Sequence, residues 1–222
     1  MQEADYIIID FDSTFISKES LDMLAEASLL KDKNHTSIIK QIERITKDGM
    51  SGKINFKDSL DQRIKLMNAN RQDVLAVSEN LKKFISKSFL KNKKFIKNNR
   101  HKIYFISGGF REMLLPTLRE FGIDEGHIYG NDFLYNSKDE IVGCNHKNPL
   151  SFENGKSKIL EMLSLEGEIH AIGDGYNDYL LKQSGKASSF FAFTENVYRK
   201  KICFIADGVL TSFDEYIKIF SY

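Results

Sequence analysis

Short apolar runs recur along the chain and alternate with amphipathic stretches. The runs are Tyr6–Asp10, Lys102–Ile106, Ile169–Gly173, Phe190–Thr194 and Cys203–Ala206. Each is too short for a helix and is followed by polar residues or glycine, as is typical of a buried strand. Helical periodicity covers stretches between them, namely Phe110–Phe121, Lys156–Leu165 and Asn177–Gln183. This alternation predicts an α/β fold in which a parallel sheet carries helices on both faces.

The interval between the first two runs breaks this rhythm. A crossover between parallel strands needs a dozen or more residues, whereas roughly ninety separate these two runs. Helical stripes fill the interval: Leu21/Leu24/Ala25/Leu29, Ile38/Ile42/Ile45, Phe56/Leu60/Ile64/Met67 and Val74/Leu81/Phe84/Ile85. Asn55 and Asn70 are predicted N-caps of the last two helices. We therefore predict a helical bundle at residues 15–85, inserted into a core formed by residues 1–14 and 86–222, where it would cover a ligand crevice.

Composition excludes several classes of protein. The chain has 222 residues, of which 41% are hydrophobic and 28% charged, so it is not a disordered protein. Its formal net charge of +1 argues against a nucleic-acid-binding protein. Residues 82–102 hold nine basic residues and no acid, which we interpret as a solvated helix face. Two cysteines form no disulfide framework, and the five histidines lack metal-ligand spacing.

The N-terminus begins with acids and not with the bases of a signal peptide, and no apolar run is long enough to cross a bilayer. We therefore expect a cytoplasmic protein that makes no membrane contact. Residues 129–142 additionally predict a hairpin with its turn near Asn136–Asp139.

Two carboxylates follow the first predicted strand, in the sequence Asp10-Phe-Asp12-Ser-Thr14. Both can face one crevice beyond the carboxyl end of the strand. One can then act as nucleophile and metal ligand and the other as general acid and base. Acids also follow strands as turn formers or helix caps, so the pair alone fits either interpretation.

Two further motifs contain groups that bind phosphate. Ser107-Gly108-Gly109 follows the second predicted strand, and glycines let the backbone approach a phosphate closely. Lys156 lies in the first turn of a predicted helix, where the helix dipole disfavours a cation. That position suggests an anionic partner. A tight strand–helix turn and a surface lysine are the alternatives when each motif is taken alone.

The fourth motif is Gly173-Asp174-Gly175-Tyr176-Asn177-Asp178, directly after a predicted strand. Asp174 leaves the strand end and Asp178 lies one helical turn further on. Two acids in this arrangement can bind a hard divalent cation, one directly and one through a second layer of contacts. A chance turn would rarely contain both glycines and both acids.

Together and in this order, the four motifs resemble those of the haloacid dehalogenase superfamily of phosphotransferases. The pattern there is D-x-D, then Ser or Thr, then Lys, then an acidic G-D-x-x-x-D loop. The resemblance covers essentially the whole chain. It implies a Rossmann-like core with a parallel sheet and an inserted helical-bundle cap.

Within the superfamily, the sequence is most similar to phosphoserine phosphatases. Asp10–Thr14 followed by Glu19 resembles that family's first motif with its substrate-binding glutamate. Met50–Phe56, with Arg63 seven residues on, resembles the family's cap segment. A substrate with an ammonium and a carboxylate needs one acid and one fork-shaped base, which the resemblance assigns to Glu19 and Arg63. Residues 143–154 match no family motif.

The resemblance implies a Mg²⁺-dependent phosphomonoesterase that releases L-serine and phosphate, as in serine biosynthesis. Asp10 would attack phosphorus and form an aspartyl-phosphate, while Asp12 would protonate the leaving oxygen and later deprotonate water. The implied metal ligands are Asp10, the backbone carbonyl of Asp12, Asp174 and Asp178. The implied substrate-binding residues are Glu19, Met50, Phe56, Arg63, Ser107, Gly108, Lys156 and Asn177.

Three alternatives remain open. The same chemistry could act on another small phosphate ester, because Tyr176 replaces the smaller residue expected in the fourth motif and could narrow the pocket. A phosphorylation domain of a cation pump shares the fourth motif, but the second acid of the D-x-D pair and the lack of membrane spans argue against it. A non-catalytic binding module would not need every catalytic position filled. The partner is in each enzymatic case a small phosphate ester, and a monomer and a homodimer are both compatible with the sequence.

Overall fold

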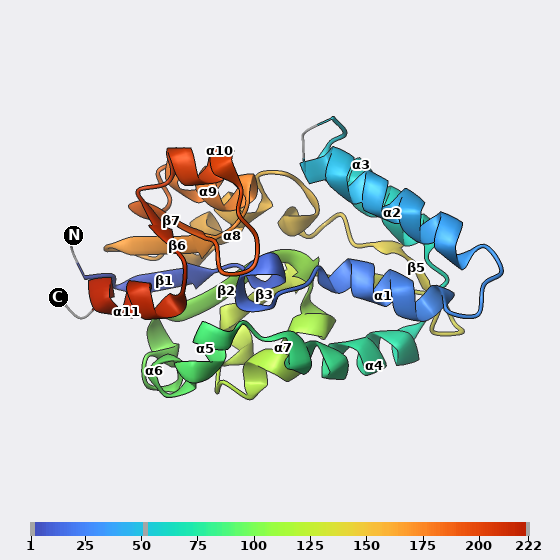
Figure 1. The fold of residues 1–222 in the computed structure, drawn as a ribbon, viewed down its shortest axis with the longest axis horizontal. Helices are drawn as coiled ribbons and strands as arrows, with labels where there is room; N and C mark the ends of the chain where they lie inside the picture. The colour runs from blue at the N-terminus through green and yellow to red at the C-terminus, as the bar shows by residue number, and fades with distance from the viewer. Residues whose placement is uncertain (1–2, 51–52, 221–222) are drawn as a thin grey trace.

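The computed structural model describes residues 3–50 and 53–220, and its core is a six-stranded sheet with the order β3-β2-β1-β6-β7-β8 (Figure 1). The strands are β1 Tyr6–Ile9, β2 Ile103–Phe110, β3 Ile128–Asn131, β6 Ile169–Gly173, β7 Ser189–Phe193 and β8 Gly208–Leu210. Every pairing between them is parallel; Ile8, for example, lies opposite Tyr104 on one side and Ala171 on the other. The predicted α/β fold with a parallel sheet is therefore confirmed.

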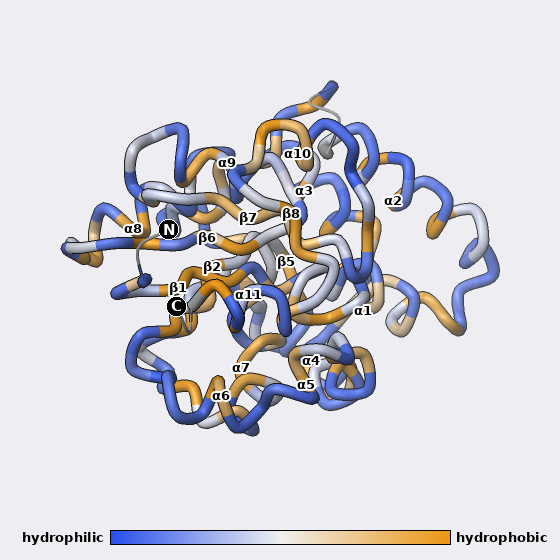
Figure 2. The backbone as a smooth tube through the Cα atoms, turned by 60° about the vertical axis from the view of Figure 1, so that its left-hand side comes forward, coloured by the Kyte–Doolittle hydropathy of each residue, from blue (hydrophilic) through white to orange (hydrophobic). Residues whose placement is uncertain are grey.

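Both faces of the sheet are buried, because successive side chains of a strand point to opposite faces. Ile8 packs into the core beneath α8 (Gly155–Leu163), α9 (Tyr176–Gln183) and α10 (Lys200–Ile205). Ile7 and Ile9 pack into the core of the other face. The helices of that face are α5 Lys87–Lys91, α6 Lys93–Asn98, α7 Arg111–Arg119 and α11 Phe213–Phe220. Figure 2 shows the apolar strands inside and hydrophilic stretches of helix on the outside.

The first four helices between β1 and β2 correspond to the four predicted stripes, and α5 and α6 follow them before β2. The four are α1 Ser20–Leu29, α2 His35–Met50, α3 Phe56–Leu66 and α4 Arg71–Leu81. Both predicted N-caps are confirmed: Asn55 accepts a hydrogen bond from the Asp58 N–H, and Asn70 forms a capping box with Asp73. Such caps stabilise a helix by about 1 kcal/mol each. The α2–α3 pair extends to one end of the molecule, beyond the carboxyl ends of the strands (Figure 1).

The inserted helices connect to the sheet through two adjacent segments. The Ser17 N–H donates to the Phe84 carbonyl, and the Ser86 N–H donates to the Phe15 carbonyl. Ile16 and Ile85 form an isolated antiparallel bridge between the same segments. α4 packs on α7, so the apolar core of one sheet face continues into the inserted helices.

One predicted strand is wrong. Cys203–Ala206 belongs largely to α10, and the edge strand β8 begins only at Gly208. Ile202 is buried whereas Phe204 is 89% exposed, which is the pattern of a helix with one apolar side. A run of four apolar residues is too short to show its period, so it cannot distinguish a strand from part of a helix.

The predicted hairpin is confirmed. β4 (Phe133–Tyr135) and β5 (Ile141–Cys144) pair antiparallel as a separate two-stranded sheet, and the Asp139 N–H donates to the Asn136 carbonyl in the turn. Among the helices of the described ranges, none has both the length and the apolar character that crossing a membrane requires.

Candidate active site

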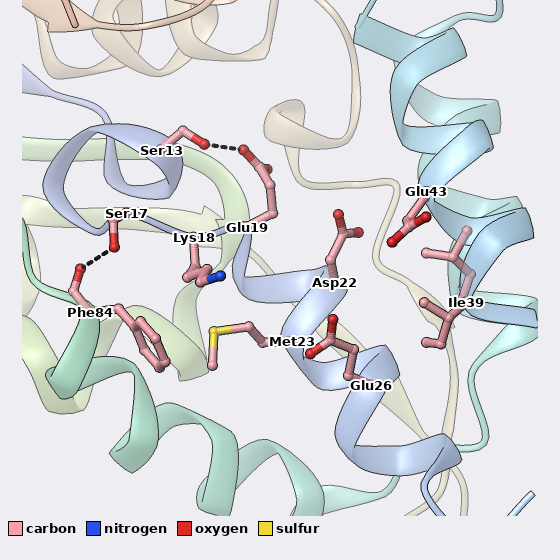
Figure 3. Close-up of a pocket in the computed structure, with 11 residues that line it drawn as sticks. Ser13, Ser17, Lys18, Glu19, Asp22, Met23, Glu26, Ile39, Glu43 and Phe84 are labelled. Atoms are coloured by element: carbon pink, nitrogen blue, oxygen red, sulfur yellow. Dashed lines mark hydrogen bonds between the residues drawn. The ribbon is translucent and has the colours of Figure 1, made fainter. Parts of the chain in front are cut away.

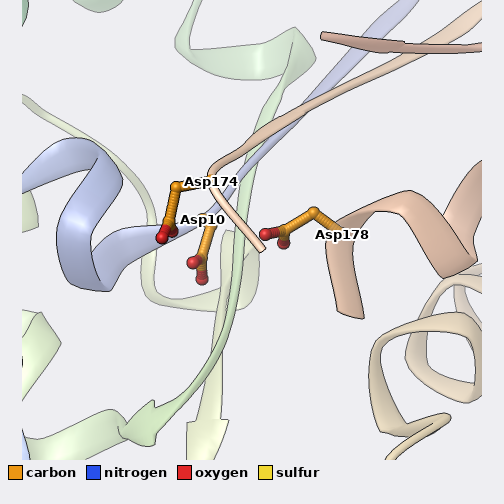
Figure 4. Close-up of side chains that lie close together, drawn as sticks. All are labelled: Asp10, Asp174 and Asp178. Carbon is orange, nitrogen blue, oxygen red and sulfur yellow. The ribbon is translucent and has the colours of Figure 1, made fainter. Parts of the chain in front are cut away.

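Three carboxylates meet at the carboxyl ends of two neighbouring strands. Asp10 directly follows β1 and Asp174 directly follows β6, while Asp178 lies in the first turn of α9. One carboxylate oxygen of each lies within 4.8 Å of the others (Figure 4). All three side chains are largely buried. Buried oxygen donors at this spacing fit Mg²⁺, a hard cation that prefers carboxylate and carbonyl ligands.

Lys156 is the cation of this cluster. Its Nζ donates to Asp10 Oδ1 and to Asp178 Oδ1, each at 2.6 Å. Burial by itself would lower the pKa of Lys156, but the two carboxylates outweigh it and raise that pKa. Gly155 lets α8 begin here, because a Cβ at that position would lie 2.3 Å from the Pro149 carbonyl oxygen. Lys156, whose position predicted an anionic partner, therefore bonds directly to two carboxylates of the cluster.

The cluster holds more negative charge than its cations balance. Burial raises the pKa of Asp10 well above its ordinary value, and repulsion from Asp178 adds to the shift. Burial and the same repulsion raise the pKa of Asp174, although Arg199 binds Asp174 through Nε and Nη2 at 2.9 and 2.8 Å. Excess buried negative charge is a second feature of the cluster that fits a divalent cation.

Asp12 lies in the turn Phe11–Phe15, beside the start of α1. Its Oδ1 accepts the Ser20 N–H at 2.9 Å, and its Oδ2 accepts the Ser20 hydroxyl at 3.0 Å. Burial raises the pKa of Asp12 to about 6. A carboxyl with a pKa near neutrality can give and take a proton at physiological pH, as general acid–base catalysis requires.

Glu19 faces the same turn from the N-cap of α1. It accepts a hydrogen bond from the Ser13 hydroxyl at 2.6 Å (Figure 3), and Ser13 has a left-handed backbone with φ 55°. Burial raises the pKa of Glu19 to about 8, and the Asp12 carboxylate adds to the shift. An ammonium placed here would offset the cost of burying the charge of this carboxylate.

The Ser107-Gly108-Gly109 segment forms the end of β2. The prediction that it follows the strand is therefore wrong. The strand continues to Phe110, with an irregular register after Ile106. The Phe56 ring packs over Gly108, where a Cβ would lie 3.0 Å from the ring. The inserted helix α3 therefore reaches the predicted phosphate-binding segment.

A cavity of about 390 Å³ opens between α1, α2 and Phe84 (Figure 3). Glu19, Asp22, Glu26 and Glu43 line it on the acidic side. Figure 3 shows Asp22 and Glu26 on α1 across the gap from Glu43 on α2.

Arg63 lies one layer behind this cavity and is only 8% exposed. Its Nη1 lies 3.7 Å from Asp22 Oδ1 and 3.4 Å from Thr46 Oγ1. Arg63 therefore contacts Asp22, which lines the same cavity as Glu19. Of the other predicted residues, Asn177 is half-buried at the start of α9. Met50 ends α2, and its side chain lies outside the described residues, as do residues 51–52 of the same motif.

Sequence reasoning missed four polar residues of this region. The Thr14 hydroxyl donates to Asp174 Oδ1 at 3.2 Å, and Arg199 pairs with the same carboxylate. Ser20 binds Asp12, and the Asn131 amide donates to the Gly108 carbonyl at 2.8 Å. Thr14 and Ser20 adjoin motifs that were recognised. Arg199 and Asn131 come from segments whose local pattern indicates no site.

Comparisons with known proteins give consistent matches in sequence and in fold. The model of the haloacid dehalogenase-like hydrolase family matches residues 7–181. A phosphoserine phosphatase of Drosophila melanogaster is 28% identical over 97% of this chain and 77% of its own length. A phosphoserine phosphohydrolase-like protein from Francisella tularensis has a TM-score of 0.84 at 29% identity, covering 96% of this chain and 98% of that one. A substrate-bound phosphoserine phosphatase complex shares the fold, with a TM-score of 0.75 at 24% identity over 99% of both chains.

Proposed function

This chain belongs to the haloacid dehalogenase-like hydrolase family, and on that basis we propose that it is a Mg²⁺-dependent phosphomonoesterase acting on phosphoserine. The observation that carries the proposal is the buried cluster of Asp10, Asp174, Asp178 and Lys156, with Asp12 and Glu19 beside it. Relatives that are phosphoserine phosphatases, of which this chain covers 77% and 91% of the length, support the choice of substrate.

We assign the metal to Asp10, Asp174, Asp178 and the backbone carbonyl of Asp12. When bound, Mg²⁺ supplies positive charge that offsets repulsion between a carboxylate and a phosphate dianion. Asp10 attacks phosphorus in line and forms an aspartyl-phosphate. Lys156 neutralises this carboxylate in the metal-free protein and is positioned to bind phosphoryl oxygens when a substrate arrives.

Asp12 exchanges protons in both halves of the reaction. It donates to the serine oxygen as that oxygen leaves phosphorus, and then accepts a proton from the water that hydrolyses the aspartyl-phosphate. Ser107, the Gly108 N–H and Asn177 complete the phosphate site. Residues 15–85 act as a cap over it, and residues 1–14 and 86–222 form the core. Phe56 contacts Gly108, which supports water exclusion by the cap when the substrate is bound.

Glu19 is the proposed partner of the substrate ammonium and Arg63 that of its carboxylate. Arg63 pairs with Asp22, which lines the same cavity as Glu19. Its contacts there are long, at 3.4–3.7 Å. A substrate carboxylate would therefore compete with Asp22 for the guanidinium, and recognition requires this exchange of partners.

The test is steady-state phosphate release from phosphoserine, phosphothreonine, phosphoethanolamine, a sugar phosphate and p-nitrophenyl phosphate, with Mg²⁺ or with EDTA. We expect Mg²⁺-dependent turnover with the highest kcat/KM for phosphoserine. Arg63→Ala should lower that kcat/KM by about 10- to 100-fold and leave kcat/KM for p-nitrophenyl phosphate nearly unchanged, because phosphoserine has a carboxylate and p-nitrophenyl phosphate has none. Glu19→Gln should be selective in the same way. Equal losses on both esters would refute the assigned recognition roles. A higher kcat/KM for phosphoethanolamine would instead favour a cationic leaving group that has no carboxylate.

A further inference from the structure

Both oxygens of the Asp12 carboxyl are bound by one residue, Ser20. The Ser20 backbone N–H donates to Oδ1 at 2.9 Å and its hydroxyl donates to Oδ2 at 3.0 Å. Ser20 is the first residue of α1 and is fully buried. A two-point contact of this kind removes rotational freedom from the carboxyl group. The position of the first residue of α1 therefore sets the orientation of the Asp12 carboxyl.

Gly109 lies against Oδ2, the carboxyl oxygen that the Ser20 hydroxyl also binds. A Cβ at Gly109 would lie 2.7 Å from Asp12 Oδ2 and 3.3 Å from the Ser20 hydroxyl. The absence of a side chain there lets Asp12 Oδ2 lie against the end of β2, next to Ser107. Oδ2 is therefore the oxygen of Asp12 that faces the predicted phosphate-binding segment.

The two donors of Ser20 differ in chemistry. A backbone N–H can only donate, so it favours Oδ1 as the unprotonated oxygen, which is the stronger acceptor. A hydroxyl can donate or accept, so it can remain bonded to Oδ2 whether that oxygen is bare or protonated. We propose that Ser20 is a positioning residue that orients Asp12 and directs the transferable proton to Oδ2. The proposal rests on the proposed function, in which Asp12 is the general acid and base.

The proton balance is simple. In the first half-reaction the bond from Asp10 to phosphorus forms, the bond from phosphorus to the alcohol oxygen breaks, and the proton on Asp12 Oδ2 goes to that oxygen. In the second half-reaction water bonds to phosphorus and loses one proton to Oδ2, while the bond from Asp10 to phosphorus breaks. Ser20 gains and loses no proton over the cycle.

Leaving-group dependence tests this role. An alkoxide leaving group needs a proton as it departs, whereas p-nitrophenolate does not. The value of kcat/KM reports the steps up to release of the alcohol. With saturating Mg²⁺, Ser20→Ala should lower kcat/KM for phosphoserine by about 10-fold or more, while kcat/KM for p-nitrophenyl phosphate stays within about threefold. Ser20→Cys preserves side-chain size but supplies only a weak donor, so it should show the same selectivity if the alanine variant folds poorly.

Ser28→Ala is the matched control, because the Ser28 hydroxyl lies on the same helix and bonds the Ala25 carbonyl of that helix. It should change neither ester's kcat/KM. If the Ser20 variants lose kcat/KM equally on both esters, or on neither, the proposed role of Ser20 is wrong. Turnover by the wild-type enzyme would still support the phosphatase proposal in that case. An inactive wild-type enzyme would instead refute the proposed function itself.

Discussion

Replacing Lys156 by methionine tests the electrostatics of the buried cluster. Methionine keeps most of the apolar stem but removes an ammonium that donates to Asp10 and Asp178 at 2.6 Å each. Lys156 is only 6% exposed, so water cannot replace those bonds. Removing one partner of a buried ion pair costs about 3–5 kcal/mol. For a chain of this size that cost corresponds to a fall in Tm of about 6–20 °C.

Thermal unfolding of the metal-free protein in EDTA at pH 7.5 measures this loss. Lys158→Met is the matched control, because Lys158 lies on the same helix and its side chain is exposed. The control should unfold within about 2 °C of the wild type, since exposed charges contribute little to stability. A Lys156→Met protein as stable as the Lys158→Met protein would refute the reasoning.

Mg²⁺ supplies a second measurement on the same proteins. A ligand that binds only the folded state raises its stability by an amount that grows with affinity. Without Lys156, the carboxylates of Asp10 and Asp178 lack their counter-ion and should bind a divalent cation more tightly. We therefore expect 10 mM MgCl₂, roughly a saturating concentration, to raise the Tm of Lys156→Met by more than that of the wild type. An equal or smaller rise would indicate that the metal does not bind these carboxylates.

Three further predictions concern the carboxylates. Asp10→Asn should lower kcat by more than about 10³-fold, because an amide cannot form the aspartyl-phosphate; near-normal activity would exclude Asp10 as nucleophile. Asp12→Asn should lower kcat by about 10²–10⁴-fold while Mg²⁺ affinity, measured by calorimetry, stays within a few-fold, because the assigned metal contact is the backbone carbonyl. The pKa values of Asp12 and Glu19, about 6 and about 8 in the folded state, exceed the ordinary values of 3.8 and 4.5. The folded state thus binds more protons than the unfolded state between about pH 4 and pH 8, so metal-free stability should fall as pH rises through that window. Glu19→Gln should flatten the fall between about pH 7 and pH 8.5, and an unchanged slope would show that Glu19 does not titrate there.

Local patterns in the sequence were enough to predict the layered fold. Strands buried on both faces appear as short, continuous apolar runs, and an amphipathic helix shows its apolar stripe every three or four residues. The parallel sheet, the four inserted helices and the caps Asn55 and Asn70 follow from these patterns. The acids of two motifs meet because parallel strands end at the same edge of a sheet, which places Asp10 near Asp174.

What the tertiary structure alone decided depends on contacts between distant segments. Cys203–Ala206 belongs to α10 because Ile202 packs on the sheet while Phe204 faces solvent, and a four-residue run contains no such information. Arg63 pairs with Asp22, and Arg199 pairs with Asp174, because the helices bring these side chains together. The two hydrogen bonds from Ser20 to Asp12 likewise arise only when α1 starts beside the turn after β1. Residue types and spacing determine which groups are available, whereas packing determines which oxygen each donor reaches.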